Sequence, residues 1–309
     1  SAAVHRQPQV SGRRDTLRAL VEFIMRGRAQ ACGVALVGYF IPLASPSTIG
    51  LVTLKKGSLE GSLVALWALL PVLLGWFVSD TEAYTANRAL TLVSSAALII
   101  MVIGAQVLRV TISWQWALIA VMVAGVVAIL GLNLLFPSGV EALVPIMTAL
   151  ISGGDAEAAS AIFDQQSLVL GLLTWGLVTT SVMSLIVARW WQALVYNPGG
   201  FREEFHGLRL DASVARVLLG IAVLGVIFFP EYALWFRLLA VPLLVSGMAL
   251  VHYSADALQL NASSVFIMYV GLFMFSPIFA LLLVCLGFVD SHWDLRVRLA
   301  DIVDRTPKE

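Results

Sequence analysis

Charged residues are scarce in this chain, and their scarcity indicates the class of protein. Only 12% of the 309 residues are Asp, Glu, Lys or Arg, whereas 60% are hydrophobic. A soluble domain has about 25% charged and about 45–50% apolar residues. The composition therefore predicts an integral membrane protein, with the lipid bilayer as its main partner. It excludes a cytosolic enzyme, a nucleic-acid binder and a secreted disulfide scaffold.

Residues that build metal, redox and catalytic sites are also few. The two cysteines, Cys32 and Cys285, lie in apolar runs and cannot make a disulfide framework. The four histidines have no HxxxH spacing, so we expect no metal site. Walker, HExxH and Ser/His/Asp patterns are absent from the sequence, so we expect neither an enzyme nor a resident cofactor.

Apolar runs cover most of the chain. A transmembrane helix needs roughly 20 mostly apolar residues, and Pro/Gly or charged clusters separate the runs. We therefore expect an all-α, polytopic transmembrane helical bundle over residues 29–289, with nine or ten membrane segments, some of them short and broken by proline. The runs lie at 29–41, 43–54, 61–78, 89–108, 114–136, 167–188, 212–229, 234–251 and 264–289.

The basic residues orient this bundle, because Lys and Arg favour the cytoplasmic side of a membrane. The scheme puts thirteen of them inside, between Arg6 and Arg216, and only Arg88 and Arg237 outside. Residues 1–28 are then a cytoplasmic tail that ends in an interfacial helix. The loop 189–211 and the tail 290–309 are also cytoplasmic, whereas the loop 137–166 is outside.

Two apolar regions allow two interpretations each. Residues 29–54 are interrupted by Pro42 and Pro46 and flanked by basic residues, which favours a hairpin of short helices over one kinked span. A cleaved signal peptide is the rival interpretation of this region. Residues 264–289 form either one span or two short helices broken at Ser276-Pro277, and the basic tail favours the break.

Some segments outside the predicted spans also have helical patterns. Residues 16–25 place Leu17, Leu20, Val21 and Ile24 on one face, which is typical of a helix that lies in the membrane interface. The sequence of the outer loop, residues 137–166, predicts two short helices, the second at 155–163. They form either a lid over the outer face or an inert interfacial loop.

Polar side chains within the predicted spans are our candidates for binding a small molecule. Gln106 and Asn133 lie in mid-helix, and Trp175 and Thr179 lie on the hydroxyl-rich sixth span. Polar residues in lipid often mark functional sites. Hydrogen bonds between helices and ordinary packing explain the same residues.

Two other features are candidates for docking a partner protein. Small residues share a face of the first short helix, where another helix can approach closely. A Pro/Gly turn after the sixth span has backbone amides that can hold an anion. Packing within the bundle and anchoring of the following helix are the simpler explanations of the same features. The residues are Ala31, Ala35, Gly38, Asn197, Pro198, Gly199, Gly200, Arg202 and Glu203.

The stretch around this turn resembles a known family. Residues 189–193 (RWWQA) and 196–205 (YNPGGFREEF) resemble the signature of the YybS-like family of predicted bacterial inner-membrane proteins, and residues 19–28 and 287–299 resemble its two ends. The family has no settled function. Its fold is thought similar to the substrate-binding subunits of energy-coupling-factor vitamin transporters. Those subunits bind a small molecule from the outer side and dock a transport module through small residues of the first helix, a role that Ala31 and Ala35 match here.

The resemblance and the composition together imply a bacterial inner-membrane location. We expect a transport-type protein that binds a small molecule within the bundle and acts with a partner protein. This chain has more predicted spans than the vitamin-binding subunits. The alternative is a membrane scaffold or regulator that recruits a partner through the loop 189–211, and a third hypothesis is lipid handling.

Overall fold

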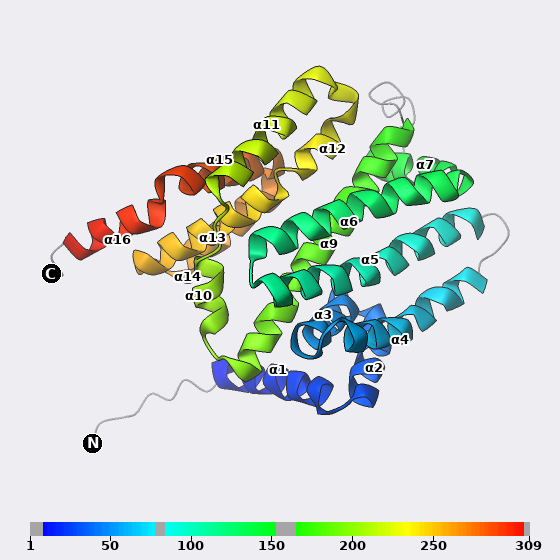
Figure 1. Ribbon diagram of the computed structural model, residues 1–309, viewed down its shortest axis with the longest axis horizontal. Coiled ribbons are helices and arrows are strands. Elements are labelled where there is room, and N and C mark those ends of the chain that lie inside the picture. The colour runs from blue at the N-terminus through cyan, green and yellow to red at the C-terminus, as the bar shows by residue number, and fades with distance from the viewer. Residues whose placement is uncertain (1–8, 78–83, 153–164, 306–309) are drawn as a thin grey trace. The chain divides into compact units, whose positions relative to one another are not determined.

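The protein is all-α, as the apolar runs predict (Figure 1). The computed structural model describes residues 9–77, 84–152 and 165–305, and these residues form helices and no strands. Two compact units divide the chain. Unit 1 contains Ser1–Ile112, Val123–Ala142 and Gly176–Phe201, and unit 2 contains Ser113–Met122, Leu143–Trp175 and Arg202–Glu309.

Unit 1 is built from the N-terminal helices and from parts of three later ones. A 3-10 turn, η1 (Gly38–Phe40), separates its two shortest helices. Three long helices, α6, α7 and α9, contribute residues to both units. The helices are α1 (Gln9–Arg26), α2 (Arg28–Val37), α3 (Ala44–Lys56), α4 (Ser58–Phe77), α5 (Tyr84–Thr111), α6 (Trp114–Leu135), α7 (Pro137–Ser152) and α9 (Gln165–Tyr196).

Unit 2 adds the C-terminal helices, which follow one another with short connections. One 3-10 turn, η2 (Pro230–Tyr232), lies among them. The helices are α10 (Gly200–His206), α11 (Ala212–Phe228), α12 (Ala233–Leu238), α13 (Val241–Ala257), α14 (Ala262–Met274), α15 (Ser276–Trp293) and α16 (Leu295–Arg305).

The described helices are compatible with a membrane protein. Four of them, α5, α6, α9 and α15, are long and apolar enough to cross a bilayer, and the pair Pro230–Leu238 and Val241–Ala257, bent by 50°, makes up to five. The predicted nine or ten membrane segments are not confirmed. The reason is length: α11 has 17 residues, and at about 1.5 Å per residue it falls short of a hydrocarbon core about 30 Å thick.

Both ambiguous apolar regions form two helices. Residues 28–56 form α2 and α3, joined through η1 and a turn in which Leu43 has a φ of 65°. Residues 262–293 form α14 and α15, which are interrupted at Phe275. Pro277 lies in the first turn of α15, where its missing N–H costs no helical hydrogen bond. The predicted helix at 155–163 lies outside the described residues.

The expected helix at 16–25 is part of α1, and unit 1 covers only part of its apolar face. Val21 and Ile24 are completely buried, whereas Leu20 and Phe23 are 38% and 42% exposed. The covered half attaches α1 to the unit. The other half remains on the surface.

Two glycines allow α13 and α15 of unit 2 to pack with their backbones in contact. A Cβ at Gly247 would lie 1.9 Å from the carbonyl oxygen of Leu283, and one at Gly287 would lie 2.3 Å from that of Leu243. Neither distance leaves room for a methyl group. Such small residues are typical of helix pairs in membranes, because they permit close packing.

We therefore expect Gly247→Ala to destabilise the protein. The added methyl must push α15 away, which costs about 1–3 kcal/mol and lowers the midpoint of thermal unfolding in detergent by roughly 2–6 °C. The matched control is Gly220→Ala in α11, where a Cβ meets nothing within 4 Å. The control should be neutral or stabilising, and equal midpoints for the two variants would contradict the close approach.

Candidate functional site

The helix α3 is short, polar and enclosed within unit 1. Residues 47–54 are all buried, as is Ser45. A helix buried on every side usually has apolar side chains all round. Four of the buried side chains of α3 carry a hydroxyl group instead: Ser45, Ser47, Thr48 and Thr53.

Close contacts hold α3 against three neighbouring helices. A Cβ at Gly50 would lie 2.2 Å from Cε of Met101 in α5 and 2.8 Å from Cβ of Ala188 in α9. A Cβ at Gly61 in α4 would lie 1.8 Å from Oγ1 of Thr53. Glycine at these two positions therefore lets α3 pack closely against α4, α5 and α9.

Some of the hydroxyl groups are satisfied locally. Thr48 donates to the carbonyl oxygen of Ala44 and Thr53 to that of Ile49, both at 2.8 Å. Ser47 donates to the carbonyl oxygen of Ser184 in α9 at 3.2 Å. Of these three bonds, the last is the one that connects α3 to another helix.

Three buried oxygens, in α3 and in two helices that pack against it, have no hydrogen-bond partner within the described part of the chain. They are Oγ of Ser45 in α3, Oε1 of Gln106 in α5 and Oγ of Ser181 in α9. A buried polar group without a partner costs about 1–3 kcal/mol. A polar ligand that reaches one of these oxygens would recover that free energy, so we regard α3 and its neighbours as the candidate binding site.

The four predicted ligand residues do not share one environment. Gln106 contributes one of the three unpaired oxygens. Asn133 in α6 is half-buried and holds a polar interaction. Trp175 donates its indole N–H to the carbonyl oxygen of Leu234 at 2.8 Å in unit 2, and Thr179 is exposed. Ser45 was not among the predicted ligand residues, although the density of Ser and Thr over residues 45–53 was a signal for it.

The small residues predicted to dock a partner are packed inside unit 1. Ala31 and Ala35 are 1% and 0% exposed, and Gly38 is buried. The helix α2 packs against α3 and α4 of the same chain. The chain itself therefore covers these three residues.

The predicted turn at 197–200 is on the surface. Asn197, Pro198 and Gly199 are exposed, and Gly199 has a φ of 93°, a conformation that favours glycine. The side chain of Asn197 lies over Gly200, where a Cβ would come 1.9 Å from its amide nitrogen. Just before the turn, Nζ of Lys55 lies 4.0 Å from the ring centroid of Tyr196, so this end of α9 is held against α3.

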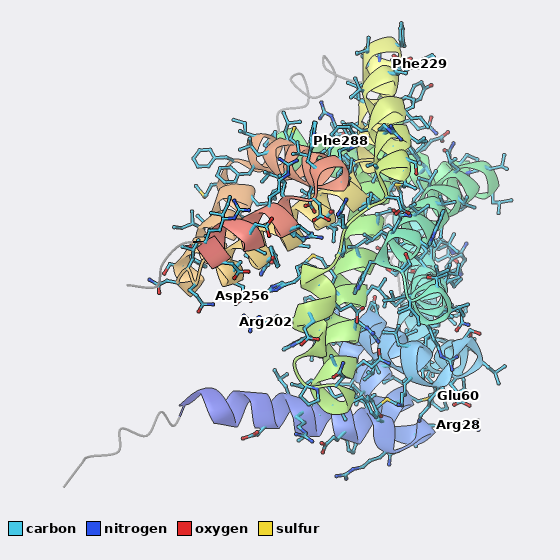
Figure 2. The ribbon with its side chains drawn as sticks, turned by 60° about the vertical axis from the view of Figure 1, so that its left-hand side comes forward. Arg28, Glu60, Arg202, Phe229, Asp256 and Phe288 are labelled. Atoms are coloured by element: carbon cyan, nitrogen blue, oxygen red, sulfur yellow. The ribbon has the colours of Figure 1, made fainter. Side chains whose placement is uncertain are left out.

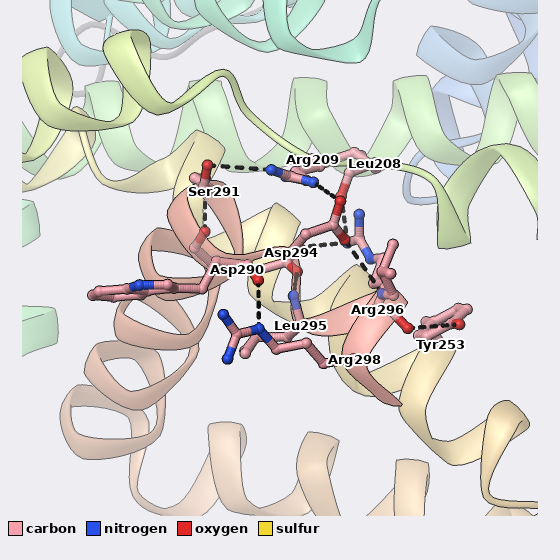
Figure 3. A network of polar contacts seen from close by, with 12 residues as sticks. Leu208, Arg209, Tyr253, Asp290, Ser291, Asp294, Leu295, Arg296 and Arg298 are labelled. Carbon is pink, nitrogen blue, oxygen red and sulfur yellow. Dashed lines mark hydrogen bonds and ion pairs between the residues drawn. The ribbon is translucent and has the colours of Figure 1, made fainter. Parts of the chain in front are cut away.

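A second polar cluster lies in unit 2, and we call it the α10 network (Figures 2 and 3). It connects the segment 202–211 to α6, α13, α15 and α16. Arg202, a predicted docking residue, forms an ion pair with Asp256, whereas Glu203 is exposed. The other members pair Trp114 with Glu204 at 2.7 Å, Gln115 with Asp211 at 2.9 Å, Arg209 with Asp294, and Arg296 with Asp290.

The buried centre of the α10 network is the pair between Asp290 and Arg296. Asp290 is completely buried and Arg296 is 9% exposed. Nη2 of Arg296 lies 3.3 Å from Oδ2 of Asp290 and donates to the carbonyl oxygen of Leu208 at 2.6 Å. Oδ1 of Asp290 accepts the N–H of Leu295, the first residue of α16, at 3.0 Å. Asp290 therefore both caps α16 and neutralises its arginine (Figure 3).

Burial affects the ionisable groups of this network. It lowers the pKa of Arg296, while the carboxylate of Asp290 opposes that effect. Burial also lowers the pKa of His206, and the positive charge of Arg202 adds to the shift. Nδ1 of His206 lies 3.8 Å from Oδ2 of Asp256, beyond hydrogen-bonding distance, and Asp256 is already paired with Arg202.

Comparisons of the chain with protein-family models, curated proteins and solved structures found no match. The resemblance to the YybS-like family therefore stays an expectation. Two polar regions of the molecule are therefore the basis for proposing a function. One is the enclosed polar helix of unit 1, and the other is the α10 network of unit 2.

The lowered pKa of His206 predicts a loss of stability in acid. An unfolded histidine titrates near 6.5, so below that pH the unfolded chain binds a proton that the folded chain does not yet bind. Stability should therefore fall as the pH drops through about 6.5 towards the pKa of the folded protein. The midpoint of thermal unfolding at pH 7.5, 6.5 and 5.5 measures this loss, and His206→Gln should reduce it. An unchanged pH dependence in the variant would contradict the assignment.

Proposed function

We propose that this protein is a transport-type protein of the bacterial inner membrane, which binds a small molecule at α3 and acts with a partner protein. The observation that carries the proposal is the enclosed polar helix α3, together with the unpaired oxygens of Ser45 in α3, Gln106 in α5 and Ser181 in α9. Transporters typically place their substrate sites at short or interrupted helices near the middle of the bilayer. The distribution of Lys and Arg supports a cytoplasmic N-terminus.

The lengths of α2 and α3 support a re-entrant hairpin. With 10 and 13 residues, the two helices are about 15 and 20 Å long, so neither crosses a hydrocarbon core of about 30 Å. Arg28 begins α2, and Lys55 and Lys56 end α3. Because basic residues favour the cytoplasmic side, the start of α2 and the end of α3 both lie there, and the chain enters the membrane and returns.

The turn between α2 and α3 has exposed apolar side chains and internal backbone hydrogen bonds, and both features suit contact with lipid. Its side chains are apolar and exposed, with Phe40 at 76% and Ile41 at 57%. The N–H of Ile41 donates to the carbonyl oxygen of Gly38 at 3.0 Å, and the N–H of Ala44 donates to that of Ile41 at 3.1 Å. Pro42 has no N–H. These two bonds satisfy part of the turn's backbone, which lowers the cost of placing the turn in hydrocarbon.

A scaffold or regulator function is the second candidate, and the surface turn at 197–200 favours it. This turn is exposed and is held by the contact between Lys55 and Tyr196. Exposed Glu203 follows it in the chain. A rigid exposed turn suits recognition by a cytoplasmic protein. Loss of partner capture on Asn197→Ala, with capture kept on Thr179→Val, would favour this function.

The test of the transport proposal is ligand binding by the full chain in detergent. We expect at least one member of a panel of vitamins and nucleosides to raise the midpoint of thermal unfolding. Gln106→Leu should weaken its binding by roughly ten-fold, because one hydrogen bond is lost. Thr179→Val, which removes an exposed hydroxyl from α9, is the control and should bind normally. The proposal fails if no compound in a broad panel stabilises the protein, or if Gln106→Leu binds as well as the unaltered chain.

A further inference from the structure

The uncovered face of α1 is the strongest feature that the proposed function does not use. Leu20 and Phe23 are exposed although they belong to the same apolar stripe as the buried Val21 and Ile24. Arg18, paired with Glu22 at 2.9 Å, lies on the opposite, polar face. An amphipathic helix whose apolar stripe is only half covered by protein needs a second apolar environment.

Positive charge is gathered where α1 ends. Arg26 is the last residue of α1 and Arg28 the first of α2, and both are exposed. Nε of Arg28 donates to Oε2 of Glu60 in α4 at 2.9 Å, so the beginnings of α2 and α4 lie together (Figure 2). Lys56 ends α3, two residues before α4 begins, and is also exposed. Three exposed cations therefore share this end of unit 1, and Glu60 offsets the charge of one of them, Arg28.

Exposed apolar side chains and exposed cations lie together at this end of unit 1, and a membrane with anionic lipids matches both. Exposed apolar side chains suit the boundary between headgroups and acyl chains, and exposed cations beside them suit negatively charged phosphates. An acidic protein would match the charges but would not require Leu20 and Phe23. Lipid headgroups match both.

We propose that Leu20, Phe23, Arg26, Arg28 and Lys56 form a surface that binds anionic phospholipid headgroups and holds α1 in the membrane interface. We call it the α1 surface. The apolar pair enters the interface, and the three cations contact the phosphates. The inference depends on the membrane location of the protein and not on substrate binding at α3, so the two proposals can fail separately.

The test is amide hydrogen exchange of residues 15–26 in the full chain, reconstituted in nanodiscs. We expect exchange to be slower by at least about ten-fold with 30% phosphatidylglycerol than with phosphatidylcholine alone. High salt should remove the difference, because it screens the charges. The triple variant Arg26→Gln, Arg28→Gln, Lys56→Gln should also remove it.

Matched controls show whether the effect belongs to the α1 surface. The variant Arg216→Gln, Arg237→Gln, Arg305→Gln removes three exposed charges elsewhere and should keep the phosphatidylglycerol effect. Phe23→Ser should speed exchange in both lipids. Equal exchange in the two lipids would overturn the proposal, as would slowing that survives in the α1-surface triple variant. Equal slowing in phosphatidylcholine nanodiscs by added glycerol phosphate, or by an acidic peptide, would assign the surface to a soluble partner instead.

Discussion

Hydrocarbon offers no hydrogen bonds, so each polar group that lies in it must find a partner within the protein or in a ligand. In the proposed membrane location, this constraint accounts for the enclosure of α3. Its hydroxyl groups turn to backbone carbonyl oxygens of α3 itself and, through Ser47, to α9. In α3, α5 and α9, buried oxygens of Ser45, Gln106 and Ser181 are the exceptions, because they have no hydrogen-bond partner among the described residues. They give the proposed binding site its chemical basis, because a polar ligand can supply the missing partners.

The two units meet the same constraint in different ways. In unit 1 the buried polar side chains of α3 are neutral hydroxyl groups. In unit 2 full charges are buried, and they occur as pairs: Asp290 neutralises Arg296 and caps α16 with the same carboxylate. Taking one partner away would leave a buried charge, which costs about 3–5 kcal/mol. The α10 network therefore fixes the segment 202–211 firmly to the helices around it.

Composition and periodicity predict the class of this fold well and its details only in part. The helical breaks at Pro42 and at Ser276-Pro277 were predictable, because proline and basic flanks act locally. The number of spans was not, because whether a run such as α11 is long enough depends on where its helix begins and ends. The burial of Ala31 and Ala35 also escaped prediction, since small residues pack against a partner or against the same chain with the same spacing. The ion pairs of Arg202 and Arg296 connect residues 54 and 6 positions apart in the chain, and the first of these has no local signal.

The re-entrant path of α2 and α3 is the central claim, and labelling of single cysteines tests it most directly. With Cys32 and Cys285 replaced by serine, cysteine is introduced at Arg28, Phe40 or Lys56 and treated with a membrane-impermeant maleimide in vesicles of each orientation. The account predicts that positions 28 and 56 react from the cytoplasmic side and that position 40 reacts from neither side. Reaction of position 40 from the outer side, or of positions 28 and 56 from opposite sides, would contradict it.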